Sequence, residues 1–256
     1  MKLFSTRLAT TLTMGATLLT VFSAGAAPVL LNTLGSSYTE NFDTLASTGT
    51  SSALPLGWAF GESGTNANAS YTAGTGSSTT GDTYSFGAAN SADRAFGTLR
   101  SGTLVPTIGV ELTNNTGGTI TSLLVSYFGE QWRQGTTGRF DRLDFQYSTT
   151  ATSVAAGVFT DFDALDFVAP NGGSTIGLLD GNLAANRTAI NGVVTGLNIA
   201  SGATFWLRWS DFDATGSDDG LAIDNFSLTA NGVPEPGSLA LAGVALLALA
   251  RIRRKH

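Results

Sequence analysis

Short runs of alternating apolar and polar residues recur along this chain, and this period-2 pattern most constrains its fold. In the clearest run, residues 141–147, the side chains of Leu143, Phe145 and Tyr147 would point to one side and the intervening polar side chains to the other. Residues 205–209 alternate in the same way. Gly, Asn and Asp separate the runs, as expected where strands turn. Helix signals are scarce, so the pattern predicts an all-β chain.

Further runs of this kind predict about ten strands in all. They lie at 38–42, 57–60, 83–86, 95–99, 105–113, 119–128, 193–199 and 221–228. The run 119–128 is apolar on both faces, which is typical of a central strand covered on both sides. Residues 62–81 predict a long loop, and residues 151–186 predict a loop-rich region with a short helix near 178–185. The aromatic residues expected in the core are Trp58, Phe60 and Trp209. This many strands in about 200 residues predict a two-sheet antiparallel sandwich.

The N-terminus has the features of a secretory signal peptide. Lys2 and Arg7 precede an apolar stretch at 8–22, and a small-residue Ala-Gly-Ala sequence ends at Ala26. We therefore expect cleavage after Ala26, so that residues 1–26 form the signal peptide.

The C-terminus combines a rigid segment, Pro234, Glu235 and Pro236, with a 12-residue apolar run at 239–250. At about 1.5 Å per residue, a helix of that length spans roughly 18 Å, which is less than the ~30 Å hydrocarbon core of a bilayer. The basic residues that follow at 251–255 would be held on the cytoplasmic side. These features predict a weak, terminal membrane stop.

The order of these parts closely resembles the PEP-CTERM sorting signal of Gram-negative bacteria. The resemblance implies recognition by an exosortase, cleavage near the motif, and a transient inner-membrane anchor formed by the short transmembrane helix. It also implies delivery to the outer surface or to the extracellular matrix. Residues 231–256 would then be the sorting signal and residues 27–230 the exported sandwich domain.

Composition removes several kinds of chemistry from the exported domain. The chain has no Cys, and its single His, His256, lies in the basic tail that we expect to be discarded. Ser-His or Cys-His catalysis and His-ligated zinc are therefore excluded. Residues 27–233 hold seven Arg, no Lys and 18 acidic residues, a formal net charge of −11. Nucleic acid and anionic membranes repel such a chain, so we expect no nucleic-acid partner and membrane contact only through the C-terminal helix.

Three segments of the body carry a second resemblance. Glu-Asn-Phe-Asp at 40–43, Leu-Pro-x-Gly-Trp at 54–58 and Ser-Asp-Asp-Gly-Leu-Ala-Ile-Asp-Asn-Phe at 217–226 are similar to the opening and closing segments of concanavalin-like and MAM-like jelly-roll domains. The resemblance implies a jelly roll whose first and last strands are neighbours, with residues 40–43 close to Asp224. The family includes lectins, glycan-binding modules and glycosidases, so it leaves function open.

The loop at 211–219 is the best candidate for an ion site. It begins Asp-Phe-Asp-Ala-Thr-Gly, which resembles a calcium loop with oxygen ligands at alternate positions and Gly at the turn. It is not an EF-hand, because its twelfth position is Ala222 instead of a bidentate Glu. Clustered carboxylates repel one another unless a cation intervenes. The alternative is a solvated loop that uses Asp and Gly for its turns. The predicted structural calcium ligands are Asp211, Asp213, Asp218 and Asp224, with Glu40 or Asp43 completing the shell.

The strand end at 127–135 is the best candidate for contact with a glycan. Aromatic faces stack on sugar rings, while Arg, Gln and Glu bond to hydroxyl groups. The alternative is that Trp132 belongs to the core and that Glu130 and Arg133 form a solvated pair. The glycan-binding candidates are Glu130, Trp132 and Arg133, joined by Trp206 and Arg208 if the two strands are neighbours.

Three functions follow from these features. We expect a non-catalytic surface or matrix protein that binds or organises extracellular polysaccharide. The alternative is a structural envelope protein that self-associates with calcium. A glycosidase would need a carboxylate pair, but the Glu residues before the sorting motif, at 40, 62, 111 and 130, lie far apart in sequence. We therefore expect no catalytic residues.

Overall fold

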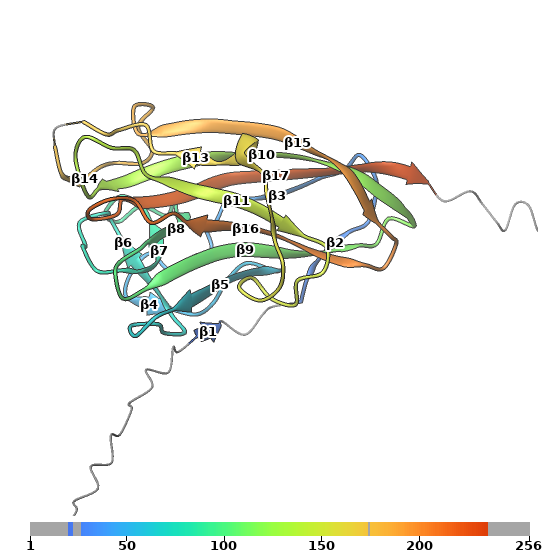
Figure 1. Ribbon diagram of the computed structural model, residues 1–256, viewed down its shortest axis with the longest axis horizontal. Helices are drawn as coiled ribbons and strands as arrows, with labels where there is room; N and C mark the ends of the chain where they lie inside the picture. Colours follow the sequence, from blue (N-terminus) through green and yellow to red (C-terminus); the bar gives the residue numbers. More distant parts are fainter. Residues whose placement is uncertain (1–19, 23–26, 174, 235–256) are drawn as a thin grey trace, which may run out of the picture.

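The computed structural model describes residues 20–22, 27–173 and 175–234, which form a sandwich of two β-sheets (Figure 1). The predicted membrane helix, Glu235 and Pro236 lie outside the described residues, as does most of the predicted signal peptide. In the part of the chain that is described, no helix is long and apolar enough to cross a membrane. The predicted all-β, two-sheet architecture is confirmed.

The first sheet contains eight strands. They are β1 (Thr20–Phe22), β2 (Val29–Leu31), β5 (Trp58–Ser63), β9 (Val105–Asn114), β11 (Arg142–Ser148), β12 (Thr160–Asp161), β13 (Phe167–Val168) and β16 (Thr204–Asp211). Their order is β1-β5-β9-β16-β11-β12, with β2 paired to β9 and β13 to β11. The strands predicted from alternation at 141–147 and 205–209 are the neighbours β11 and β16.

The second sheet contains nine strands. They are β3 (Ser37–Glu40), β4 (Thr50–Ser51), β6 (Tyr71–Gly74), β7 (Asp82–Phe86), β8 (Ala95–Leu99), β10 (Gly118–Gln134), β14 (Gly177–Leu178), β15 (Arg187–Ile199) and β17 (Gly220–Pro234). Their order is β14-β10-β17-β8-β7-β6-β4, with β15 paired to β10 and β3 to β17. The long strands β15, β10 and β17 run side by side along the upper part of Figure 1.

Several local predictions need correction. The sheets are mixed, because β2 runs parallel to β9 and β6 runs parallel to β7. Strand β6 lies inside residues 62–81, where a loop is predicted, and hydrogen bonds to its partner strand fix it without a strong hydrophobic pattern of its own. The helix predicted near 178–185 is wrong, since that segment holds part of β14 and turns. The described residues place a 3-10 turn, η1, at Asp163–Leu165 instead.

The central strand β10 is covered less completely than its apolar sequence predicts. Its residues Leu123 and Val125 face the core and are buried, but Leu124 is 43% exposed. On the adjacent strand β15, Val193 pairs with Leu124 and is also exposed. One face of this pair of strands is therefore open to solvent at that point.

Aromatic rings fill the space between the sheets. The rings of Trp58 and Trp209 stack with centroids 5.9 Å apart, and the ring of Phe226 meets both edge-on. Trp58, Phe60 and Trp209 are fully buried, as predicted. The indole N–H of Trp58 donates a hydrogen bond of 2.9 Å to the hydroxyl of Tyr38, which joins the core to β3.

The turn before β5 requires glycine for two separate reasons. Gly57 has a φ of +76°, and a Cβ there would lie 2.7 Å from Val29 and 2.8 Å from the carbonyl oxygen of Glu111. Gly49 has a φ of +66°, but a Cβ there would meet no described atom within 4 Å.

We expect Gly49→Ala to lower the free energy of unfolding by about 1–2 kcal/mol through backbone strain alone. We expect Gly57→Ala to lower the free energy of unfolding by the same strain and by about 1–3 kcal/mol more, because its Cβ would overpack against its neighbours. Urea denaturation of both variants measures the two losses of unfolding free energy. Equal losses would contradict the steric role of Gly57.

Candidate functional site

Two hollows adjoin on the second sheet near the end of β10. The first, of about 310 Å³, is lined mainly by apolar side chains: Thr75, Ala88, Ala89, Trp132, Leu178, Leu179 and Asp180. The second, of about 200 Å³, is rich in hydroxyl groups and is lined by residues that include Ser47, Thr72, Thr75, Ser77, Ser78, Tyr84, Ala88, Ala89 and Arg94. Both hollows share Thr75, Ala88 and Ala89, and we call them together the distal groove.

The sheet fixes the position of the distal groove along the sandwich. Trp132 lies near the end of β10, whereas Gly118 at the start of that strand pairs with Pro234. The groove is therefore at the end of the sandwich opposite to the point where the described chain stops.

A stack of three aromatic rings supports the distal groove. The ring centroids of Tyr84 and Phe86 are 4.8 Å apart, and those of Phe86 and Trp132 are 6.1 Å apart. Each of these residues is 2% exposed or less. A Cβ added at Gly181 would lie 2.4 Å from the indole nitrogen of Trp132, so the 179–181 segment packs closely against that ring. Trp132 is thus a buried residue that lines the groove, and it does not present an open stacking platform.

Glu130 and Asp224 form a buried pair of carboxyl groups on the same face of the sheet as Trp132. Glu130 pairs with Ala222, and Phe128 pairs with Asp224, so the two acids are diagonal neighbours across β10 and β17. Glu130 is fully buried. Its Oε2 accepts a hydrogen bond of 3.0 Å from the Trp132 indole N–H, and its Oε1 has no partner among the described residues.

The surroundings of this pair raise the pKa of both groups. Burial raises the pKa of Glu130 to about 7; the hydrogen bond from Trp132 opposes the shift, and the charge of Asp93 adds to it. Burial, followed by the charge of Glu130, raises the pKa of Asp224 to about 8. The charges of Asp93 and Asp43 raise the pKa of Asp224 further. The pair therefore takes up protons near neutral pH.

The other glycan-binding candidates lie in two different places. Arg133 lines a separate hollow of about 420 Å³ together with Arg100 and Asp218. Trp206 and Arg208 belong to β16, whose neighbours are β9 and β11 in the first sheet, so they do not share a face with Trp132. The five candidates therefore do not form one site.

A loop covers Trp206 and Arg208 on the outer side of the first sheet. The guanidinium of Arg208 lies 3.6 Å from the ring centroid of Phe159 and donates a hydrogen bond of 3.1 Å to the Val154 carbonyl. Trp206 is 4% exposed and packs with Val154 and Ala59. Sequence alone could not reveal this cover, because it depends on where the loop at 149–159 folds back.

The candidate calcium ligands of the 211–219 loop already have partners. Asp211 Oδ2 accepts a hydrogen bond of 2.7 Å from the Thr98 hydroxyl, while its buried Oδ1 has no partner among the described residues. Asp213 forms an ion pair of 3.2 Å with Arg100. Asp218 accepts a hydrogen bond from the backbone of Ala214. The unpaired Oδ1 of Asp211 is a carboxylate oxygen of the kind that binds calcium. However, the guanidinium of Arg100 already supplies positive charge near this carboxylate.

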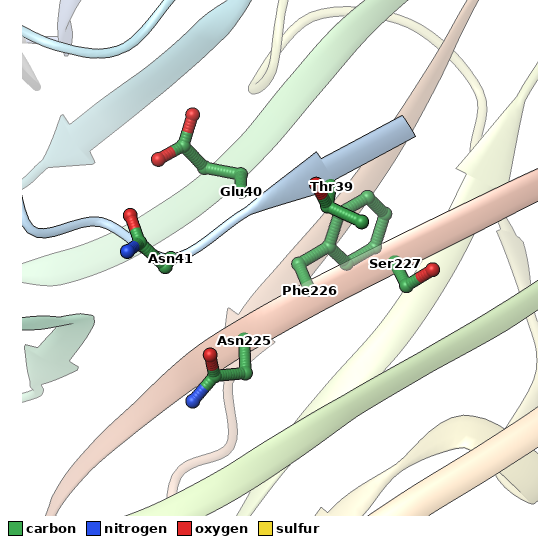
Figure 2. Close-up of a pocket in the computed structure, with 6 residues that line it drawn as sticks. All are labelled: Thr39, Glu40, Asn41, Asn225, Phe226 and Ser227. Atoms are coloured by element: carbon green, nitrogen blue, oxygen red, sulfur yellow. The ribbon is translucent and has the colours of Figure 1, made fainter. Parts of the chain in front are cut away.

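The remaining calcium candidates lie on β3 and β17. Glu40 pairs with Phe226, so the opening segment of the jelly-roll resemblance lies beside the last strand, as expected, although β2 precedes it and pairs with β9 in the other sheet. A hollow of about 480 Å³ at their junction is lined by Thr39, Glu40, Asn41, Asn225, Phe226 and Ser227 (Figure 2). In that view the polar ends of Glu40, Asn41 and Asn225 point in different directions. Asp224 accepts hydrogen bonds from Asn225, and Asp43 accepts one from Asn41.

The six candidate calcium ligands thus belong to two groups, and calcium binding stays a prediction. Across residues 20–22, 27–173 and 175–234, no cluster of three or more Asp, Glu, His or Cys side chains is placed to hold a metal ion.

The fold and the C-terminal sequence together define an exported β-sandwich protein with a sorting signal. Residues 232–255 match the family model described as the PEP-CTERM protein-sorting motif, so the predicted sorting signal is confirmed. The motif implies a secreted protein that is anchored transiently in a membrane and processed by an exosortase. No curated protein sequence matches the chain.

Several solved structures are similar to the sandwich at low identity. The CBM22-1 xylan-binding domain from Paenibacillus barcinonensis Xyn10C is 10% identical with a TM-score of 0.33, over 82% of this chain and 99% of that one. The CBM22-1–GH10 modules of Clostridium thermocellum Xyn10B with xylohexaose are 12% identical with a TM-score of 0.38, over 79% and 29%. The K3 cleaved adhesin domain of Porphyromonas gingivalis Lys-gingipain is 11% identical with a TM-score of 0.35, over 56% and 78%. These TM-scores are below 0.5, so the similarities carry no argument about function.

The buried carboxyl pair predicts a pH-dependent stability. Folding raises the pKa of Glu130 to about 7. The contribution of this group to the stability of the folded state is therefore fully present below the unfolded pKa of about 4.3, and it is lost as the pH rises through 7. We expect Glu130→Gln to raise the melting temperature relative to wild type progressively from pH 5 to pH 8. The exposed Asp213→Asn serves as the control for loss of one charge. A difference between Glu130→Gln and wild type that stays constant with pH would contradict the assignment.

The calcium prediction is tested by removing the ion. If the carboxylates at 211–218 or at 40–43 and 224 hold calcium, adding a chelator lowers the melting temperature of the purified protein, because ligand binding stabilises the folded state by mass action. Restoring excess calcium recovers the original melting temperature. An unchanged melting temperature contradicts a structural calcium ion at either place.

Proposed function

We propose that this protein is a non-catalytic cell-surface or extracellular-matrix protein of a Gram-negative bacterium, and that it binds or organises extracellular polysaccharide through the distal groove. The sorting motif supports the location, since it implies secretion. The observation that carries the binding proposal is the groove itself, in which an apolar hollow adjoins a hydroxyl-rich one.

The two halves of the groove suit the two kinds of surface on a sugar ring. The C–H face of a pyranose is apolar and packs against exposed apolar side chains such as Leu178 and Ala89, which Trp132 supports from beneath. Its hydroxyl groups both donate and accept, and hydroxyl side chains such as those of Thr75 and Ser77 can do the same. Pockets for small ligands generally combine an apolar lining with a few polar groups in this way.

The charge of the exported domain favours a neutral polymer. Residues 27–233 carry a formal net charge of −11, so an acidic polysaccharide would be repelled at long range. The same charge opposes association between copies of the chain, which weighs against the self-associating envelope protein unless a cation bridges them.

The buried carboxyl pair supports a role without catalysis. In glycoside hydrolysis one carboxyl group must reach the glycosidic oxygen and the other must reach the sugar or a water molecule. Glu130 is fully buried and Asp224 is 2% exposed, so neither is open to a substrate in this structure. We propose that their role is to join β10 to β17.

Filling the groove tests this proposal. Ala89 is exposed and lines both hollows, so Ala89→Trp would occupy the space that they share. We expect this variant to bind the producing organism's neutral exopolysaccharide at least about tenfold more weakly than wild type, a loss of about 1.4 kcal/mol in affinity electrophoresis. The matched control is Ala200→Trp, which places the same side chain at an exposed turn between β15 and β16.

Two outcomes would contradict the proposal. Unchanged binding by Ala89→Trp would place the glycan elsewhere on the protein. If the wild-type protein bound no polysaccharide and instead formed calcium-dependent oligomers, the structural envelope function would be the better account.

A further inference from the structure

Five strand ends and three turns meet at the end of the sandwich where the described chain stops. Pro234 pairs with Gly118, and the start of β10 also lies beside the end of β15, since Ile120 pairs with Ile199. In the first sheet, Thr204 at the start of β16 pairs with Thr113 near the end of β9. The turns at this end are residues 32–36, 115–117 and 200–203. We call this set of strand ends and turns the tail end.

The tail end carries no charge. Residues 30–36, 112–120, 197–206 and 228–234 contain no Asp, Glu, Lys or Arg. The opposite end of the sandwich is rich in both signs, with Arg139 in ion pairs with Asp141 and Asp219, and Arg100 with Asp213. In a domain with a net charge of −11, these ranges thus carry no acidic residue, and the first carboxylate after Pro234 is Glu235 of the sorting motif.

The tail end is tied together by a buried side chain. Asn114 is fully buried, and its amide donates hydrogen bonds of 2.8 Å to the carbonyl groups of both Gly118 and Ile199. Its side-chain oxygen accepts hydrogen bonds from the backbone and hydroxyl of Thr116, and its main-chain carbonyl accepts one from the backbone N–H of Gly202. The turns and the start of β10 therefore form one rigid surface next to Pro234.

The sequence leaves little chain between this surface and the membrane anchor. Only Glu235, Pro236, Gly237 and Ser238 separate Pro234 from the apolar run that begins at Leu239. Five Cα–Cα steps span at most about 18 Å even when fully extended. Strand β10, by comparison, has 17 residues and a length of roughly 55 Å. A tether this short keeps Pro234 near the bilayer and lets the far end of the sandwich stand well away from it.

We infer that, while the tail is inserted, the tail end faces the lipid headgroups and the distal groove faces away from the membrane. This inference rests on the membrane anchoring that the sorting motif implies and is independent of polysaccharide binding. Electrostatics favours this orientation, because a lipid surface that contains anionic headgroups repels carboxylates within about a Debye length of ~10 Å. A sandwich lying flat would bring acidic residues against that surface, such as Asp144 on β11 or Asp43 and Asp93 near Asp224. An upright sandwich presents an end whose strands and turns are uncharged, with Glu235 of the motif as the one carboxylate in the tether.

The absence of Cys from the chain makes a direct test simple. Ser201→Cys places one thiol at an exposed position of the tail end, and Thr137→Cys places one at an exposed position beyond the opposite end of β10. Neither side chain makes a hydrogen bond that the fold needs. Each full-length variant is labelled with the same fluorophore and reconstituted into anionic vesicles that contain a lipid with a quencher on its headgroup.

We expect the label at Ser201→Cys to lose most of its fluorescence in these vesicles and the label at Thr137→Cys to retain it. The same labelled proteins in vesicles without the quencher lipid give the baseline for each position. Equal quenching at the two positions, or stronger quenching at Thr137→Cys, would overturn the inferred orientation. Because no polysaccharide is present, this result is separate from the outcome of the groove-filling variant.

Discussion

The antiparallel ladder between β10 and β17 is the constraint on which the rest of this structure depends. It extends from the pair Gly118–Pro234 to the pair Arg133–Gly220 and so runs the length of the sandwich. Its inner face carries Phe226 into the aromatic core, and its outer face carries the pair of buried carboxyl groups. Asp224 and Phe226 are two residues apart yet face opposite sides, because the pairing shifts between Ser126 and Phe128 and leaves an extra residue in β17 at Asn225, which has a φ of +49°. Without this β-bulge, the alternation of side chains would place both residues on the same face. The fold, the perturbed acids and the exit point of the tail are therefore set by one pairing.

The same ladder separates two chemically different ends. At one end β17 reaches the sorting motif among uncharged turns that Asn114 holds together. At the other end lie the ion pairs of Arg139 and the hollows of the distal groove. A protein that is first held at a membrane and then released outside benefits from this separation, because the acidic residues that keep it soluble do not oppose its anchoring. The proposed groove also stays accessible before and after the tail is cleaved.

The sequence was sufficient for features that depend on local patterns. Alternation in residues 141–147 and 205–209 predicted β11 and β16, and the order of parts after Pro234 predicted the sorting signal. Features that depend on pairing between distant segments could not be predicted. Glu130 and Asp224 become neighbours only through a register that joins strands about 90 residues apart, and the cover over Arg208 depends on the path of a loop. Strand β6 was missed because its short, polar sequence gains order from β7 and not from a hydrophobic pattern.

Hydrogen exchange with and without polysaccharide tests the central claim most directly, because it follows every segment of the protein at once. The account predicts added protection of backbone amides in residues 75–89 and 175–181, which surround the distal groove, and none in residues 200–203 at the tail end. Two results would contradict the claim that this protein binds its polymer at the end directed away from the membrane. One is added protection at the tail end. The other is added protection on the outer face of the first sheet with no added protection at the groove.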